Sequence, residues 1–384
     1  MNFHPVQGAL PEYVNFVIVG GGFTGLAAAA WLRRLAPKKS VLVIESATLG
    51  EGASGRTGGL ALADTAAGPL RGLGNVLLGY KNILRALRVD SGLELRGVWE
   101  LGRSNTRKNS PIFWNDSGDL KVVRRVAGSV VDPGKVVAGL ARAAQEAGAQ
   151  IIEHTRVDAI GFSNPLQLRV ECRTRGRIER KEIRAGRILL ATNAYSAELS
   201  GLARNIAPRL TLALATAPLS RAQLRAIGLS SRRPFYTVDL PYLWGRLLES
   251  NGVIFGAGLV PIPKSFEALF RDSHRGRSRK HAAFRLYNLD VRKGESADRL
   301  RWLEDRVRHL HPALRSVRIT HRWGGPILFT EGMRPIFRRH PRSKNAIVLG
   351  GYNGHGVALS VYLGKWAAEA LLARRALPAW GRGN

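Results

Sequence analysis

The sequence predicts an α/β fold in which one domain, assembled from separated segments, is interleaved with a second domain built on a mixed sheet. Three observations support this prediction. Near the start, a β-branched run leads through three glycines into an alanine-rich helical pattern. The same order of strand, glycines and helix returns near the end of the chain. Between these regions, short alternating runs predict strands rather than long helices.

The first segment reads as a βαβ unit. Residues 15–19 are predicted to form a strand, residues 24–35 a helix and residues 40–44 a second strand. The apolar stretch at residues 16–32 is nearly long enough to span a membrane, but its glycines favour a tight turn between a strand and a helix. We therefore expect no transmembrane segment.

The middle and the end of the chain carry further elements of the same domain. A helical pattern at residues 133–147 ends at Gly148, a typical C-cap. Strand patterns follow at residues 150–153, 166–172, 177–183 and 187–191, and the two middle ones alternate around Gly176 as a hairpin does. A strand at residues 346–349 and a helix at residues 357–374 complete the domain.

These segments divide the chain into two predicted domains. The first comprises residues 1–79, 132–203 and 326–384. The second comprises residues 80–131 and 204–325, where short alternating runs and polar segments are mixed. Each part is long enough to bury a core of its own.

Composition narrows the class of protein. Of 384 residues, 45% are hydrophobic and 23% charged, which excludes a disordered basic tail, a collagen-like chain and a coiled coil. The single cysteine, Cys172, excludes an intramolecular disulfide and a multi-thiolate metal site and fits a cytoplasmic location. The histidines show no metal-ligand spacing, so no metal is expected. The net charge of +31 suits a polyanionic partner or reflects an arginine-rich composition.

The first glycine cluster fits the pattern G-x-G-x-x-G between a strand and a helix. Gly20 permits a tight turn, Gly22 lets the backbone approach a pyrophosphate, and Gly25 allows the helix to pack closely on the sheet. Glu45 stands twenty residues further on, at the end of the second strand, where it can accept hydrogen bonds from a ribose. The pattern predicts a dinucleotide site, and the carboxylate disfavours a 2′-phosphate.

Two further glycine clusters lie elsewhere in the chain. Residues 52–59 combine glycines and hydroxyls with Arg56, as in a backbone that lies flat against a ligand. Residues 350–356 again stand between a strand and a helix and include His355. A second helix start of this kind would direct more N–H groups at an electron-rich part of the same ligand.

The sequence resembles the FAD-dependent amine and amino-acid oxidoreductases of the D-amino-acid oxidase superfamily, and most of all their gamma-glutamylputrescine oxidase branch. The resemblance rests on motifs in family order: VIVGGGFTGLAAAAWL, VIESATLGEGASGRTGG, LLATNAYS, HRWGG and GGYNGHGVALSVYLGKWAAEALL. It implies a Rossmann-like FAD-binding domain of the glutathione-reductase type and a mixed-sheet substrate domain. It also implies FAD, which we expect to be non-covalent because no cysteine lies near the C-terminus.

The resemblance further implies which residues contact FAD. The glycines of the first cluster would hold the pyrophosphate, Glu45 the ribose, Val157 the adenine through its backbone, and the last loop the flavin ring. The full set is Gly20, Gly22, Phe23, Thr24, Gly25, Glu45, Ser46, Ser54, Gly55, Arg56, Thr57, Gly58, Gly59, Val157, Thr192, Asn193, Gly351, Tyr352, Asn353, Gly354, His355 and Gly356.

Family chemistry is the removal of hydride from a carbon that bears nitrogen, followed by hydrolysis of the imine. Alternation at residues 240–249 puts Tyr242, Trp244 and Arg246 on one face, as an aromatic wall with a guanidinium for an amine that bears a carboxylate. The alternative is that the two rings are core and Arg246 is solvated. His355 is either a donor near the flavin or a cap of its turn. We take Tyr242, Arg246 and His355 as catalytic candidates.

Three functions remain open on the sequence. The first is an enzyme that oxidises a small amine or amino acid, with O2 or another electron acceptor. The second is an FAD enzyme acting on a modified tRNA nucleoside, which the basic charge suits although nucleic acid is not favoured. The third is a non-catalytic flavoprotein that docks on anionic surfaces. Residues 243–259 contain no lysine of the kind that speeds reaction with oxygen in some relatives, so oxidase and dehydrogenase both remain open.

Overall fold

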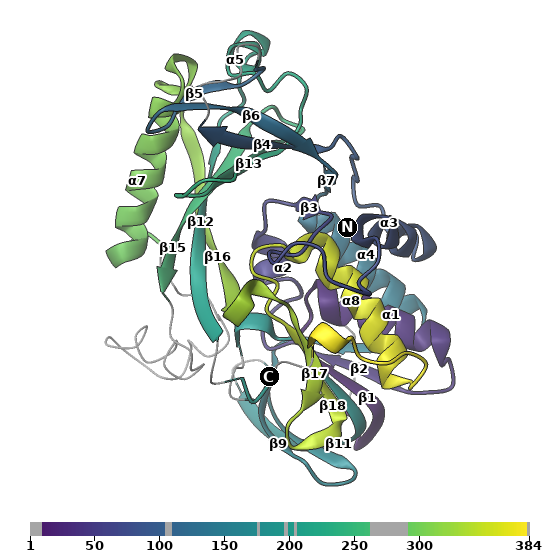
Figure 1. Ribbon diagram of the computed structural model, residues 1–384. Helices are drawn as coiled ribbons and strands as arrows, with labels where there is room; N and C mark the ends of the chain where they lie inside the picture. Colours follow the sequence, from purple (N-terminus) through teal and green to yellow (C-terminus); the bar gives the residue numbers. More distant parts are fainter. Residues whose placement is uncertain are drawn as a thin grey trace.

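The computed structural model describes residues 10–103, 110–174, 177–195, 199–202, 206–261 and 291–381. Two large sheets lie in different parts of the molecule (Figure 1). Most of the helices gather around one sheet, and a single long helix lies along the other.

Among the described residues, the first sheet has eight strands, six of them in the order β17-β18-β11-β1-β2-β8. Their bounds are β1 Tyr13–Val19, β2 Val41–Ile44, β8 Gln150–Ile152, β9 Thr155–Gly161, β10 Leu166–Thr174, β11 Arg177–Leu190, β17 Ile336–His340 and β18 Ser343–Gly350. Strands β8, β2, β1, β11 and β18 are parallel neighbours, whereas β10 pairs antiparallel with β11 and β9 pairs antiparallel with β10. The carboxyl end of β1 therefore opens in the middle of one sheet edge, where parallel sheets bind ligands.

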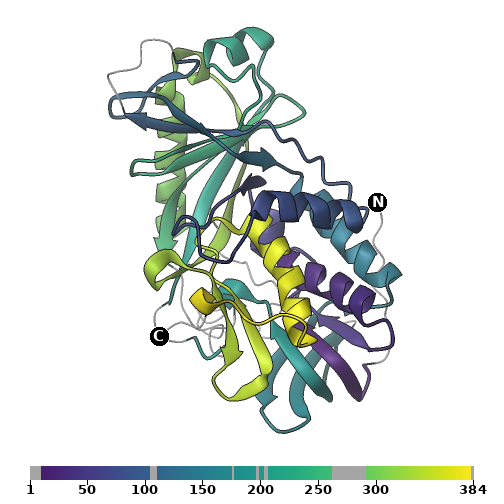
Figure 2. The ribbon, with the colours of Figure 1, turned by 45° about the vertical axis from the view of Figure 1, so that its right-hand side comes forward.

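Four helices cover one face of this sheet (Figure 2). They are α1 Phe23–Leu35, α3 Val76–Ala86, α4 Pro133–Glu146 and α8 Gly356–Leu371. Along β1, Phe16 and Ile18 pack against the helices, and Val17 and Val19 pack on the opposite face against β9, β10 and β11. This strand is apolar on both faces because it is covered on both.

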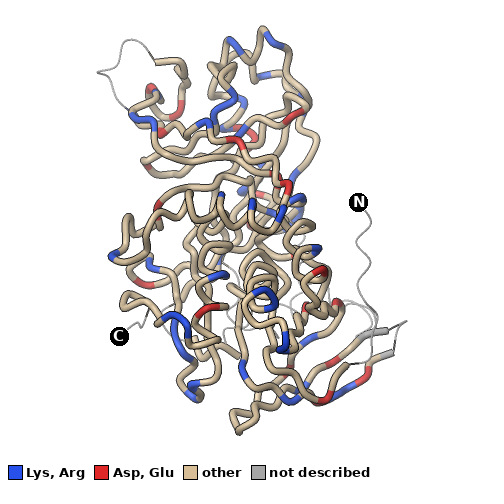
Figure 3. The backbone as a smooth tube through the Cα atoms, turned by 90° about the vertical axis from the view of Figure 1, so that its right-hand side faces the viewer, with Lys and Arg blue, Asp and Glu red and all other residues tan. Residues whose placement is uncertain are grey.

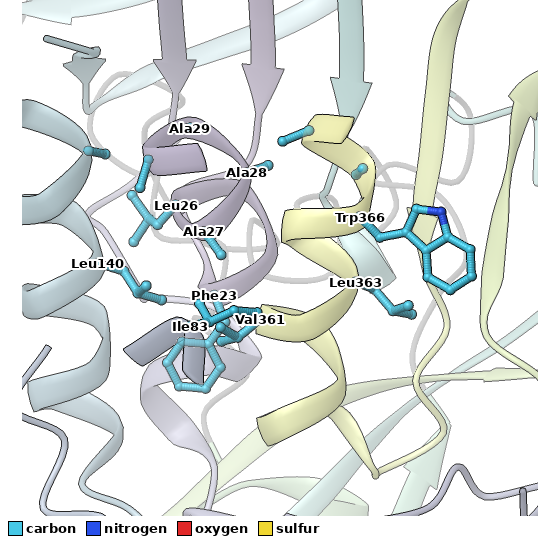
Figure 4. Packing of buried hydrophobic residues seen from close by; sticks show 14 of the residues in the cluster. Phe23, Leu26, Ala27, Ala28, Ala29, Ile83, Leu140, Val361, Leu363 and Trp366 are labelled. Carbon is cyan, nitrogen blue, oxygen red and sulfur yellow. The ribbon is translucent and has the colours of Figure 1, made fainter. Parts of the chain in front are cut away.

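Helices α1 and α8 approach closely because the residues between them are small. Ala27 and Ala28 of α1 lie on the side of that helix that packs against α8 (Figure 4). At Gly364 a Cβ would lie 2.6 Å from the carbonyl oxygen of Thr24. The alanine-rich pattern thus sets the distance between the two helices whose N-termini meet at the site.

The second sheet runs in the order β16-β12-β15-β14-β13-β4-β6-β5. Its strands are β4 Val98–Arg103, β5 Phe113–Asn115, β6 Asp119–Val126, β12 Ile206–Thr216, β13 Phe235–Thr237, β14 Leu243–Leu247, β15 Val253–Pro261 and β16 Ile319–Thr330. Helix α7, Gly294–Leu310, packs Leu303 and Val307 onto the core of this sheet, and α5, Arg221–Ala226, lies at its end. Trp114 and Phe235 meet edge to face at 4.9 Å in that core.

Short elements connect the two parts. Strand β3, Leu60–Leu62, pairs with β7, Gly128–Val130, between the two large sheets (Figure 1). Helix α2 is Ala53–Arg56, and the 3-10 turns are η1 Asn193–Tyr195, η3 Pro312–Leu314, η4 Glu331–Met333 and η5 Ala379–Gly381.

Some predicted elements differ from the observed ones. The predicted strands at residues 177–183 and 187–191 are one strand, β11, because it pairs with β10 along its first part and with β1 along its second. The predicted turn at Gly176 lies outside the described residues.

Two predicted domain boundaries fall inside elements. The boundary at residue 80 cuts α3, whose Tyr80, Ile83 and Leu84 are buried in the core of the first sheet. The boundary at residue 326 cuts β16, which pairs with β12 along its whole length. Helix α3 therefore extends the part that contains the first sheet beyond residue 79. Strand β16 extends the part that contains the second sheet beyond residue 325. The division into two domains stays a prediction.

Candidate active site

The turn between β1 and α1 presents backbone to a large cavity. Gly20 has φ +111°, and a Cβ there would lie 2.7 Å from the carbonyl oxygen of Ala191. A Cβ on Gly22 would lie 2.8 Å from Ser54 Oγ. The N-cap Gly22 supplies no side-chain cap, and the first turn of α1 carries no acidic residue. This helix start therefore suits an anionic ligand.

Glu45 follows β2 and braces this turn. Its carboxylate accepts hydrogen bonds from Gly21 N at 2.7 Å, Ala47 N at 2.9 Å and Ser46 Oγ at 3.2 Å. Burial raises the pKa of the Glu45 carboxyl, and the hydrogen bonds oppose part of that rise. Glu45 and Ser46 both line the cavity. The residue predicted to bind a ribose thus also holds the glycine turn.

The segment around α2 ties the two parts of the molecule together. Ser54 Oγ accepts a hydrogen bond from Phe23 N at 2.9 Å, at the start of α1. The Arg56 guanidinium pairs with Glu51 at 2.8 Å and donates to the carbonyl oxygen of Gly324, on β16, at 3.3 Å. Arg56 therefore holds the backbone of two walls of the cavity together.

The last glycine loop is held by side chains from distant segments. Tyr352 Oη and Thr24 Oγ1 are hydrogen-bonded at 2.6 Å and buried. Asn353 Nδ2 donates to the carbonyl oxygen of Gly351 at 2.7 Å, and Asn353 Oδ1 accepts from Thr330 N at 2.8 Å. The loop between β18 and α8 is thus fixed both to α1 and to β16.

Helix α8 begins beside the cavity. Its N-cap residue, His355, makes no side-chain cap, and the first turn carries no acidic residue. Ser360, one turn further on, lines the cavity, and its buried Oγ has no hydrogen-bond partner. Asn193 Oδ1 accepts from Gly351 N at 2.9 Å and so supports the approach to this helix. A second positive helix end therefore faces the cavity, as the sequence predicts.

One cavity of about 1170 Å³ joins these features. It is larger than the roughly 300–1,000 Å³ of a usual small-ligand pocket. Eighteen of the residues predicted to bind the cofactor line this cavity: Gly20, Gly22, Phe23, Thr24, Glu45, Ser46, Ser54, Arg56, Thr57, Gly58, Val157, Thr192, Asn193, Tyr352, Asn353, Gly354, His355 and Gly356. At one end Val157 lies between Arg156 and Asp158, which form an ion pair at 2.5 Å.

Four predicted cofactor-binding residues do not line this cavity: Gly25, Gly55, Gly59 and Gly351. A Cβ at Gly25 would lie 2.0 Å from the carbonyl oxygen of Gly20, and one at Gly59 would lie 2.3 Å from that of Val131. These glycines are required where two pieces of backbone meet. They shape the site without facing it.

The residues present fit a flavin dinucleotide. Two helix starts without acidic residues face one cavity, and glycines leave the backbone of the first turn uncovered where it lines that cavity. The buried Ser360 Oγ, lacking a protein partner, offers a hydrogen bond inside the cavity.

The second sheet supplies the opposite wall. A row of register partners crosses seven strands in the order Arg124, Glu100, Tyr236, Trp244, Gly256, Ala213 and Trp323. Direct partners point to the same face of a sheet. The Trp244 ring lies 2.0 Å from a Cβ position on Gly256 and 2.2 Å from one on Gly58, so only glycines leave room for it. Trp323 Nε1 donates to the carbonyl oxygen of Arg56 at 3.0 Å. The wall thus contacts the cofactor-binding segment directly.

The three catalytic candidates have different positions. Tyr242 lines the cavity and is 52% exposed. Arg246 is not among the lining residues, and its closest acidic neighbours include Asp132 and Glu94. Burial lowers the pKa of Arg246, and its Nε has no hydrogen-bond partner. The guanidinium predicted for the substrate pocket is therefore not among the residues that line the cavity.

His355 lines the cavity, and its Nδ1 is 3.3 Å from the carbonyl oxygen of Asn353. Burial lowers the pKa of the His355 imidazole, which favours the neutral ring. A neutral imidazole donates one hydrogen bond and accepts another. His355 makes no side-chain hydrogen bond to the start of α8, but its contact with Asn353 lies within the turn, as the alternative of a turn-capping histidine predicts.

Sequence reasoning missed part of the second wall. Tyr236 of β13 and the segment 325–329 of β16 line the cavity. Alternation marks each as a strand, but the pairing of β13 with β4 and of β16 with β12 has no local signal. The HRWGG motif at the start of this segment is the one local signal for β16, and no predicted site residue lies in residues 325–329.

The family comparison identifies the class of protein. A family model described as FAD dependent oxidoreductase matches residues 15–370. The chain belongs to this family of FAD-dependent oxidoreductases. The predicted cofactor and the predicted enzyme class are thus confirmed. Cys172, the single cysteine, is not among the cavity-lining residues, as expected for non-covalent FAD.

Two curated relatives span most of this chain. A probable oxidoreductase OrdL of Haemophilus influenzae is 26% identical over 94% of this chain and 83% of its own length. The gamma-glutamylputrescine oxidoreductase of Escherichia coli is 24% identical over 92% of this chain and 82% of its own length. The predicted resemblance to this branch is therefore confirmed at low identity.

Solved structures confirm the fold class. Glycine oxidase from Geobacillus kaustophilus superposes with a TM-score of 0.70 at 19% identity, over 97% of this chain and 98% of that one. L-proline dehydrogenase from P. horikoshii gives a TM-score of 0.66 at 18% identity, over 97% of each chain. Within the described part of this chain, no helix has the length and apolar character needed to cross a membrane.

Proposed function

We propose that this flavoprotein oxidises a C–N bond of an amine or amino acid by hydride transfer. FAD supplies the hydride acceptor when it is bound. The product imine is then hydrolysed to an aldehyde or keto acid plus an amine or ammonia. Electrons pass on to O2 or another acceptor.

The observation that carries this proposal is the pair of walls that face one cavity. On one side lie the open start of α8 and the neutral His355. On the other side lie Trp244 and Tyr236 of the second sheet. The positive end of α8 stabilises negative charge that develops beside it. The aromatic residues exclude water and orient a small organic substrate.

Relatives and charge support a substrate class. The E. coli relative is named for gamma-glutamylputrescine and the structural neighbour for glycine. Figure 3 shows lysine and arginine along both parts of the molecule, and the net charge is +31. This field attracts a substrate that carries a carboxylate and repels a free polyamine. A cytoplasmic location remains part of the proposal.

The test is a visible spectrum followed by anaerobic titration. Purified protein should absorb near about 370 and 450 nm, as oxidised flavin does, and lose these bands with one member of an amine and amino-acid panel. The panel includes gamma-glutamylated amines. Protein that stays colourless after FAD reconstitution contradicts cofactor binding. Flavin that no compound bleaches contradicts the proposed reaction.

The high positive charge favours one second candidate, an FAD enzyme acting on a modified tRNA nucleoside. That candidate predicts tRNA binding that weakens steeply as salt concentration rises. Binding without flavin reduction would instead favour a non-catalytic flavoprotein that docks on anionic surfaces.

A further inference from the structure

Tyr236 is the centre of a polar cluster in the second wall. Its hydroxyl donates to Glu100 Oε1, and the same carboxylate accepts from Arg124 Nε at 2.6 Å and Nη2 at 3.0 Å. Glu100 is only 5% exposed, whereas the Arg124 side chain is 69% exposed. The three side chains are register neighbours on β13, β4 and β6.

This cluster fixes what Tyr236 offers to a ligand. The hydroxyl proton is directed at Glu100, so the remaining capacity of the oxygen is to accept a hydrogen bond. Burial and the adjacent carboxylate both raise the pKa of Tyr236, which keeps the phenol protonated. In this state the Tyr236 oxygen can accept a hydrogen bond from an N–H group of a substrate. It has no second proton to donate to a substrate carboxylate.

The Tyr236 oxygen lies in a part of the cavity lining that is mostly aromatic and apolar. Trp244 is its register partner on β14, and Val238 and Leu240 follow it in the lining. Thr237 is already engaged, since its Oγ1 donates to the carbonyl oxygen of Asp239 at 3.1 Å and accepts from Leu243 N at 2.8 Å. A polar substrate atom near Trp244 therefore finds its acceptor in Tyr236.

We propose that Tyr236 is a substrate-binding residue whose oxygen accepts a hydrogen bond from the substrate N–H, and that Glu100 and Arg124 are positioning residues that fix the direction of its hydroxyl. This inference rests on the proposed amine oxidation. It makes substrates that carry an N–H better than tertiary amines, and it gives Tyr236 no role in holding FAD.

The test compares amines that differ in N–H groups. Butylamine, N-methylbutylamine and N,N-dimethylbutylamine form one series, and glycine, sarcosine and N,N-dimethylglycine form the other. With rates calculated on the concentration of neutral amine, anaerobic flavin reduction by the holoenzyme should favour the N–H-bearing members by about 5- to 10-fold, as expected for a hydrogen bond between neutral groups. Tyr236→Phe should remove most of this preference and leave FAD affinity unchanged.

A binding measurement provides a second readout. The carbon beside nitrogen in tert-butylamine carries no hydrogen, so this amine presents N–H groups without being oxidised. Its dissociation constant, measured by calorimetry on the FAD-loaded protein, should rise about 10-fold in Tyr236→Phe. Tyr13→Phe removes an exposed hydroxyl outside the cavity lining and should change neither quantity.

Glu100 variants separate positioning from support of the fold. Glu100→Gln keeps an acceptor for the hydroxyl and should retain the N–H preference within about threefold, whereas Glu100→Leu frees the hydroxyl to rotate and should lose it. Equal loss in both variants, together with a lower Tm, contradicts the positioning role.

The two proposals fail in different ways. If Tyr236→Phe retains the N–H preference and the affinity for tert-butylamine, the role of Tyr236 is contradicted while amine oxidation stands. If neither series nor the wider panel reduces the wild-type flavin, amine oxidation itself is contradicted.

Discussion

The two walls of the cavity present different kinds of groups to a ligand. The first wall presents glycine backbone and helix starts, at Gly20, Gly22 and Gly356. The second wall presents side chains of a sheet, with Trp244 and Tyr236 at its centre. A backbone wall suits a ligand that does not vary, whereas side chains on a sheet can be exchanged without disturbing it. The cofactor and the substrate are therefore held by separable structures.

The largest expected effect lies in the backbone wall. In Gly25→Val, the new Cβ would lie 2.0 Å from the carbonyl oxygen of Gly20 and 3.0 Å from Ile18 Cγ2. Overpacking of this kind costs about 1–3 kcal/mol, so FAD affinity should fall about 5- to 150-fold and Tm should fall with it. Fluorescence titration with FAD measures the first quantity and thermal unfolding the second.

The matched control is Gly161→Ala, where the nearest atoms to a Cβ are 3.4 Å away. It should keep the wild-type affinity for FAD. If Gly25→Val also binds FAD within about threefold of wild type, the backbone wall tolerates side chains and the contrast between the walls is lost.

Trp244→Ala tests the second wall. Loss of a largely buried aromatic side chain removes about 1.5–3 kcal/mol of apolar contact, so kcat/KM should fall about 10- to 100-fold. Affinity for FAD should fall by a smaller factor than kcat/KM, as expected if the Trp244 ring affects the cofactor only through its packing on Gly58. Equal losses in both quantities would show that the walls are not separable.

Glu45→Gln has opposite effects on the empty and the loaded protein. FAD affinity should fall about 10-fold, since the amide replaces a charged acceptor for the ribose. The raised pKa of Glu45 means that the wild-type apoprotein loses stability as pH rises through that pKa, and the glutamine variant does not. The Tm of the variant minus that of wild type should therefore increase from about pH 4 to 7 in the apoprotein. A difference that is constant with pH argues against a buried, ionising carboxylate.

Arg246→Leu is expected to have the smallest effect. Because Arg246 is absent from the cavity lining, KM for a carboxylate-bearing substrate should change by less than about twofold. Thermal unfolding of the variant reports separately what loss of this buried cation does to the fold. A tenfold rise in KM without loss of stability would return Arg246 to the substrate site.

The contrast between the walls also explains what the sequence predicts well. Gly20, Gly22 and Glu45 belong to one local βαβ unit, so their spacing alone defines the turn and the carboxylate beside it. The rest of the predicted cofactor set, including Val157, Thr192 and Asn193, follows from the family resemblance and not from local spacing. Gly25, Gly55, Gly59 and Gly351 do not line the cavity, because a motif does not distinguish a glycine that faces a ligand from one that packs against the protein itself.

The second wall follows from long-range pairing. Tyr236 becomes a cavity residue because β13 lies between β4 and β14, and β4 is more than a hundred residues away in the sequence. Alternation correctly places Trp244 at the cavity. It gives no information on the acidic residues that surround Arg246, since Asp132 and Glu94 belong to other segments.

The buried hydrogen bond between Thr24 and Tyr352 has a consequence for synthesis of the protein. It joins residues 328 positions apart, so the first glycine turn leaves the ribosome long before its partner. A nascent chain that ends before α8 lacks the second helix start. It also lacks the apolar residues of α8 that pack against α1. Contacts of such long range form late. Both helix starts that face the cavity are therefore present only after α8 has been synthesised.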